Sequence, residues 1–185
     1  MRPWVAALTI VAAGCSSGAR ILNSYRAPGT VSFVFTKVVV IVLNGSRDQR
    51  AALEDEVVKE RPRLVAAHTV LAPEDMRSVA VAKQKLLADK FDGVVTMRLI
   101  RATEVNPETL ARGESFSSYA ESSATPETPF GPNMVRIETN IYELPDEKLI
   151  WSATVEAPRS KEPRDTVRAA VDAMLDELRA TGLVH

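Results

Sequence analysis

The sequence predicts an α/β domain with a tendency toward α+β, folded as two or three layers of secondary structure. Residues 38–42 read VVVIV, and an uninterrupted β-branched run is typical of a strand covered on both faces. Strand and helix patterns alternate as far as residue 100, which favours helices layered against a sheet. The expected order is β-α-β-α-β, a long loop and then β-β-α, in a mixed sheet with a C-terminal antiparallel hairpin.

The first strand, 37–43, leads into a helix whose start is marked in the sequence. Ser46, followed by Gln49 three residues later, forms the pattern of a capping box. Apolar residues then recur at helical spacing, so a helix is expected over 47–61. Pro62 restricts the conformation of the residue before it and therefore marks the end of this helix.

Another strand and another helix are expected before the third strand. The short apolar segment 63–71 predicts the strand and contains His68. Pro73 predicts the start of the helix, because proline suits the first helical turn. Gly93 is expected to end it, and 94–100 to form the third strand. The residues expected on the buried face of this helix are Met76, Val79, Ala80 and Leu87.

Two segments after residue 133 predict a hairpin. Residues 135–142 and 149–155 alternate apolar and polar side chains, which is typical of strands with one buried face. Trp151 falls on the apolar side of this alternation and is expected in the core.

The last helix has the clearest pattern in the chain. Pro163 predicts its start, and Gly182 stands where a glycine ends many helices. Arg168 and Asp172 are expected to pair on its exposed face. The apolar stripe consists of Val167, Ala170, Val171, Met174, Leu175 and Leu178.

Residues 106–133 are expected to form a long loop, because the segment is rich in Ser, Thr, Pro and Glu and has no period. Phe116, Tyr119 and Phe130 are its candidate partner-binding residues, since aromatic side chains in a polar segment can anchor a protein partner. In the alternative interpretation, Phe116 and Tyr119 fold back and cover an edge of the sheet. Both interpretations stay open at this point.

Cys15 is the single cysteine of the chain and follows a short apolar run. The charged start, the apolar core and the small residues before Cys15 predict a secretory signal peptide over 1–14. A cysteine at the first mature position looks like a bacterial lipoprotein signal, with Cys15 as the lipidated residue. The run is shorter than the roughly 20 residues of a spanning helix, and ordinary cleaved secretion is the main competing interpretation. Residues 15–30 are expected to be a loose tether, and 31–185 a single domain.

The composition argues against several classes of function. The 23 basic and 24 acidic side chains nearly cancel, at a net charge of −1, so nucleic acid is not expected as a partner. His68 and His185 have no second ligand at metal spacing, and neither a metal nor a cofactor is expected. Asp89 and Asp92 are interpreted as turn chemistry rather than as an acid–base pair. Residues 44–46, NGS, are interpreted as a βα turn rather than as a phosphate cradle, and no catalytic residue is assigned.

Five short segments of the chain carry a family resemblance, and they are 13–15 (AGC), 50–55 (RAALED), 91–95 (FDGVV), 138–142 (ETNIY) and 149–153 (LIWSA). Together they resemble a family of small bacterial lipoproteins of unknown function. Its fold looks like that of the TolB N-terminal domain, the curli-secretion lipoprotein and the penicillin-binding-protein activator lipoprotein. The resemblance implies a place in the cell envelope and a non-enzymatic role.

The sequence therefore predicts a lipoprotein held by its lipid anchor at the periplasmic face of the outer membrane. Ser16 directly after the cysteine is, by analogy with lipoprotein sorting, the residue type that favours delivery there. We expect a non-enzymatic binding or scaffolding module with an envelope protein as partner, and the oligomeric state is left open. The alternatives are a periplasmic carrier of a small ligand, which needs an apolar pocket, and a hydrolase with a site dispersed over loops.

Overall fold

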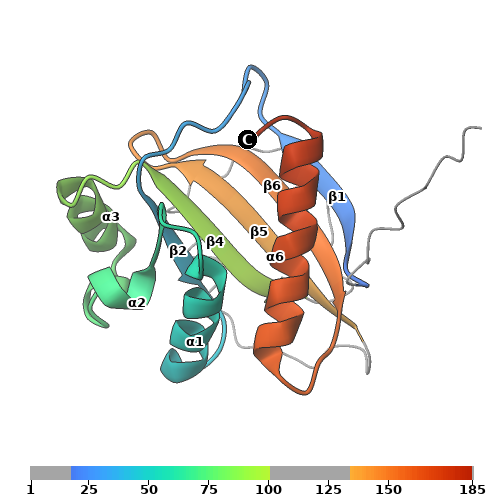
Figure 1. Cartoon of the computed structure of the whole chain (residues 1–185). Helices are drawn as coiled ribbons and strands as arrows, with labels where there is room; N and C mark the ends of the chain where they lie inside the picture. Colours follow the sequence, from blue (N-terminus) through green and yellow to red (C-terminus); the bar gives the residue numbers. More distant parts are fainter. Residues whose placement is uncertain (1–17, 101–133, 185) are drawn as a thin grey trace, which may run out of the picture.

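The computed structural model describes residues 18–100 and 134–184 (Figure 1). The described residues form one six-stranded sheet in the order β1-β6-β5-β4-β2-β3, with helices against it, so the predicted α/β class is confirmed. The elements are β1 (Arg20–Arg26), β2 (Val38–Val42), α1 (Arg47–Val58), β3 (Leu64–Ala66), α2 (Ala67–Val70), the short 3-10 helix η1 (Asp75–Arg77), α3 (Val79–Ala88), β4 (Gly93–Ile100), β5 (Met134–Glu143), β6 (Lys148–Pro158) and α6 (Pro163–Ala180).

The sheet is parallel in one half and antiparallel in the other. β2 pairs in parallel with β3 on one side and with β4 on the other. β4, β5, β6 and β1 then pair antiparallel in succession, and β5 and β6 form the predicted C-terminal hairpin. Every residue of β2 is buried, as the continuous β-branched run predicted.

Helices cover both faces of the sheet. α1 and α6 pack on one face, where Val57 and the buried residues of α6 join Val40 and Met97 in one apolar cluster. α2 and α3 lie on the opposite face, where Leu86 packs with Val39 in a second cluster. The connection from β2 to β3 thus passes over one face of the sheet, and the connection from β3 to β4 passes over the other. This is required when two crossovers have the same hand but run in opposite directions across the sheet.

The expectation of a loose tether over 15–30 is wrong for residues 20–26. β1 occupies Arg20–Arg26 and pairs antiparallel with β6, with a register shift between Ile21 and Asn23. No residue of β1 is fully buried, and its sequence has no apolar run. An edge strand of this kind is stabilised mainly by its ladder to β6, which single-sequence patterns do not reveal.

The second strand is shorter than expected, and His68 lies outside it. β3 ends at Ala66, and residues 67–70 form the short helix α2, which contains His68. Glu60 adopts φ 61° between α1 and β3, a left-handed conformation that glycine usually takes. The expected second helix is also divided, because Ser78 is extended between η1 and α3. Its buried residues are Ala82 and Leu86, whereas Met76 is exposed.

The predicted start and end of α6 are confirmed, and the predictions for the hairpin are confirmed only in part. Pro163 begins α6, and Gly182 follows it at φ 68°. Trp151 is buried in the core, as expected. The hairpin, however, is buried on both faces rather than on one. The buried polar residues of its second face are Glu138, Asn140, Ser152, Thr154 and Glu156.

Candidate functional site

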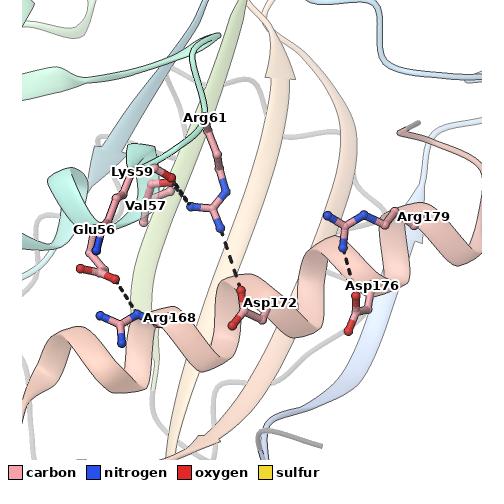
Figure 2. A network of polar contacts seen from close by, with 8 residues as sticks. All are labelled: Glu56, Val57, Lys59, Arg61, Arg168, Asp172, Asp176 and Arg179. Carbon is pink, nitrogen blue, oxygen red and sulfur yellow. Dashed lines mark hydrogen bonds and ion pairs between the residues drawn. The ribbon is translucent and has the colours of Figure 1, made fainter. Parts of the chain in front are cut away.

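None of the four residues that the sequence proposed for a site falls within the described ranges. Cys15 lies before residue 18, and Phe116, Tyr119 and Phe130 lie between residues 100 and 134. The pairing expected between Arg168 and Asp172 is not the one observed. Arg168 instead bonds Glu56 of α1 at 2.7 Å, while Asp172 lies 3.9 Å from Arg61 (Figure 2).

A pocket of about 210 Å³ lies between α1, α6 and the sheet, and we call it the α1–α6 pocket. Its wall is mostly hydrocarbon, contributed by strands β2, β3, β4, β5 and β6, by both helices and by the segment before β2. The lining residues are Phe33, Phe35, Val38, Val57, Arg61, Arg63, Leu64, Val95, Met97, Thr139, Ile141, Trp151, Val171, Met174, Leu175, Leu178 and Val184. A concave apolar site with few polar groups is the usual form of a small-ligand site.

The segment before β2 forms one side of this pocket because Asp92 holds it in place. The Oδ2 atom of Asp92 accepts hydrogen bonds from the backbone nitrogen and the hydroxyl of Thr36, at 2.8 and 2.6 Å. Its Oδ1 atom accepts one from the backbone nitrogen of Lys37 at 3.0 Å. Burial raises the pKa of Asp92, but these hydrogen bonds outweigh burial and hold its pKa below the ordinary value. The interpretation of Asp92 as a structural turn residue is therefore supported.

Gly93 gives Phe35 the room to enter the pocket wall. A Cβ atom at Gly93 would lie 2.9 Å from the Phe35 ring, closer than van der Waals contact allows. Phe35 in turn lies beside Phe33, with ring centroids 6.0 Å apart, and the backbone nitrogen of Phe33 donates to the carbonyl of Leu183. Asp92 and Gly93 thus hold the segment before β2 against the sheet, and Phe33 joins it to Leu183, just after α6.

Three polar side chains line the α1–α6 pocket, and its charged groups are both cationic. Arg63 is exposed and reaches only the Phe35 carbonyl, at 3.5 Å. Arg61 donates to the carbonyls of Val57 and Lys59 and faces Asp172 (Figure 2). Sequence patterns drew attention to Pro62 between these arginines as a helix boundary, and the arginines themselves were missed.

Thr139 is the third polar side chain of the pocket. It is 2% exposed, and its hydroxyl has no hydrogen-bond partner among residues 18–100 and 134–184. Buried hydroxyls are almost always hydrogen-bonded, so an unpartnered one in the wall of a pocket indicates a place for a polar atom of an occupant.

A second hollow of about 220 Å³ lies on the same face of the sheet, and we call it the Leu99 hollow. It shares Met97 with the α1–α6 pocket, and both hollows lie where α1 and α6 cover the sheet. The lining residues are Val42, Leu53, Met97, Arg98, Leu99, Val135, Ile137, Arg159, Ser160, Pro163, Thr166 and Val167.

His68 lies against two carboxylates. The buried Glu54 accepts from the backbone nitrogen of His68 at 2.9 Å and contacts its Nδ1 at 3.0 Å. The other Glu54 oxygen accepts from the backbone nitrogen of Val42, and Asp55 lies 3.3 Å from the His68 Nε2. Within residues 18–100 and 134–184, no group of three or more His, Cys, Asp or Glu side chains is arranged to hold a metal.

The second face of the hairpin carries a row of paired polar side chains. Glu156 bonds Arg20 at 2.7 Å and Arg136 at 3.1 Å, and these hydrogen bonds hold its pKa below the ordinary value. Arg98 bonds Glu138 at 2.7 Å across β4 and β5. These contacts tie β1, β4, β5 and β6 together, so we assign this row to the architecture of the sheet.

Comparisons with known proteins give a structural similarity alone. No protein-family model and no curated protein matches the chain. A solved PelC dodecamer from Paraburkholderia phytofirmans is similar at 9% identity and a TM-score of 0.46, over 90% of this chain and 99% of that chain. A variant of the same dodecamer is similar at 9% identity and a TM-score of 0.45, over 90% and 98%. The likeness to the three lipoprotein folds named from the sequence stays a prediction.

Proposed function

We propose that this chain is a lipid-anchored, non-enzymatic binding module of the bacterial envelope, with the α1–α6 pocket as its binding site. The observation that carries the proposal is the pocket itself, an apolar hollow with two arginines and one unpartnered hydroxyl in its wall. Such a hollow is what the small-ligand carrier, the alternative raised from the sequence, requires. An envelope protein remains the partner proposed for Phe116, Tyr119 and Phe130.

The position of β1 supports an anchor close to the body. β1 begins at Arg20, so Cys15 is five residues before the first strand of the sheet. Five residues span at most about 18 Å when fully extended. Within the described residues, no helix is long and apolar enough to cross a membrane. In this proposal the lipid on Cys15 holds edge strand β1 near the periplasmic surface of the outer membrane.

Metabolic labelling of bacteria that express the chain tests the anchor. The wild-type chain should incorporate an alkynyl palmitate and fractionate with the outer membrane. Cys15→Ser should remain unlabelled and appear in the soluble periplasmic fraction, whereas Ser16→Ala, as a matched control, should keep the label. A Cys15→Ser chain that still carries the label or stays with membranes would contradict the anchor.

A further inference from the structure

We infer that the α1–α6 pocket binds a single acyl chain with an anionic head group, the chain lying along β4 and the head group meeting Arg63. This inference rests on the proposed function, because it names the ligand of the same pocket. Four observations carry it: the shape of the apolar path, its size, the sign of its charge and the unpartnered hydroxyl of Thr139.

The apolar path is long and narrow rather than compact. Val95 and Met97 line the α1–α6 pocket, and Met97 and Leu99 line the Leu99 hollow. These alternate residues of β4 point to one face, and from Val95 to Leu99 the strand advances about 13 Å. Met97 stands between the hollows with an unbranched, flexible side chain that can yield to an occupant. A linear hydrocarbon fits this path better than a fused ring system does.

The volumes are sufficient for a hydrocarbon chain. The two hollows measure about 210 and 220 Å³. An engineered apolar cavity of about 150 Å³ already binds benzene. Filling the path with methylene groups therefore brings the chain into contact with the apolar wall and removes apolar surface from water.

The charge of the lining selects the head group. The charged side chains lining the α1–α6 pocket are Arg61 and Arg63, and no carboxylate is among its lining residues. In the described parts of the chain, no carboxylate lies within 4.0 Å of the Arg63 guanidinium. An exposed guanidinium at the edge of an apolar pocket can bind a carboxylate or phosphate with two hydrogen bonds.

Thr139 adds a preference for an oxygen on the chain. It pairs with Met97 in the β4–β5 register, so its hydroxyl lies midway along the apolar path. That hydroxyl lacks a hydrogen-bond partner. A hydroxyl or ester oxygen on the acyl chain would satisfy it, and a hydrogen bond of this kind changes affinity by about two- to tenfold.

The test is a titration of the intact purified chain with defined amphiphiles below their micelle concentrations. The probes are myristate, 3-hydroxymyristate and tetradecyltrimethylammonium, followed by calorimetry and by the fluorescence of Trp151 in the pocket wall. Myristate should bind at least tenfold more tightly than the cationic amphiphile. Arg63→Gln should weaken myristate binding about tenfold, whereas Arg77→Gln, an exposed arginine of η1 on the opposite face, should leave it unchanged.

Two further variants test the place of the chain. Leu175→Trp fills the pocket from a half-buried position of α6 and should abolish binding while leaving the thermal melting curve unchanged. Thr139→Val keeps the volume and should remove the preference for 3-hydroxymyristate over myristate. Equally tight binding of the cationic amphiphile would overturn the anionic ligand but leave the pocket as a binding site. No binding of any of the three probes would overturn the pocket as the site, and leave the Cys15 anchor to its own test.

Discussion

One oxygen atom of the Asp92 carboxylate accepts hydrogen bonds from both the backbone nitrogen and the hydroxyl of Thr36, at 2.8 and 2.6 Å. This contact joins the turn before β4 to the segment before β2, which are 56 residues apart in the chain. It places Phe35 over Gly93 and so closes one end of the α1–α6 pocket. The Asp92-Gly93 turn can be recognised in the sequence. Its contact with Thr36, through which it shapes the pocket, cannot.

Asp92→Asn should destabilise the protein at neutral pH by about 1–3 kcal/mol, because a charged acceptor of three hydrogen bonds is lost. The pKa of Asp92 in the folded state lies below its unfolded value of 3.8. Its contribution to stability is therefore complete above pH 3.8 and is lost as the pH falls toward the folded pKa. Urea denaturation from pH 7 to pH 3 should show the wild type and Asp92→Asn converging below about pH 4.

Asp89→Asn is the matched control for this variant. Asp89 is an exposed residue at the end of α3. The same chemical change there should leave the free energy of unfolding within about 0.5 kcal/mol of the wild-type value. Equal effects of the two substitutions would contradict the role assigned to Asp92.

Gly93→Ala should destabilise the protein by about 1–3 kcal/mol, because its Cβ would stand 2.9 Å from the Phe35 ring and force that ring out of place. Phe35→Ala in the Gly93→Ala background removes the ring atoms that clash. The double variant should therefore be more stable than the sum of the two single effects predicts, as a denaturation cycle of the four proteins would measure. Simple additivity would show that Gly93 is needed for some other reason.

Elements with a strong local pattern were predicted well from the sequence. β2 is a continuous β-branched run, and α6 combines an N-terminal proline, an apolar stripe and a final glycine. β1 was missed because its residues are half-buried, and its place depends on β6, more than 120 residues away in the chain. His68 was predicted in a strand because residues 63–71 are mostly apolar. In the structure it lies in α2, where its backbone nitrogen donates to Glu54.

The candidate site was harder to predict than the fold. Its wall is built from the segment before β2, two helices and five strands, so no local spacing identifies it. The sequence contains a weak indication of Arg61 and Arg63 as site residues, because these two basic residues flank Pro62 at the end of an amphipathic helix. The alternating pattern of the hairpin also led to a wrong prediction. It indicated that Asn140 and Ser152 lie on an exposed face, whereas both are buried and hydrogen-bonded to each other.

Glu54→Gln should destabilise the protein by about 1–3 kcal/mol, because a buried carboxylate that accepts from Val42 and His68 loses its charge. The amide hydrogens of Val42 and His68 should exchange faster in this variant, as hydrogen-exchange NMR would show. Asp55→Asn changes the more exposed partner of His68 and should alter stability by less than about 0.5 kcal/mol. Unchanged exchange at both amides would contradict the bridging role of Glu54.

Arg168→Gln should lower stability only slightly, because the Glu56–Arg168 pair joins α1 to α6 at a partly exposed position. The hydrogen bond from Arg168 holds the pKa of Glu56 below its ordinary value of 4.5. The stability from this pair is therefore present above pH 4.5 and is lost as the pH falls through the lowered pKa. A double-mutant cycle with Glu56→Gln should give a coupling energy at pH 7 that decreases as the pH falls below 4.5. Arg179→Gln removes the exposed pair with Asp176 inside α6 and should show no such coupling to Glu56, since it does not reach α1.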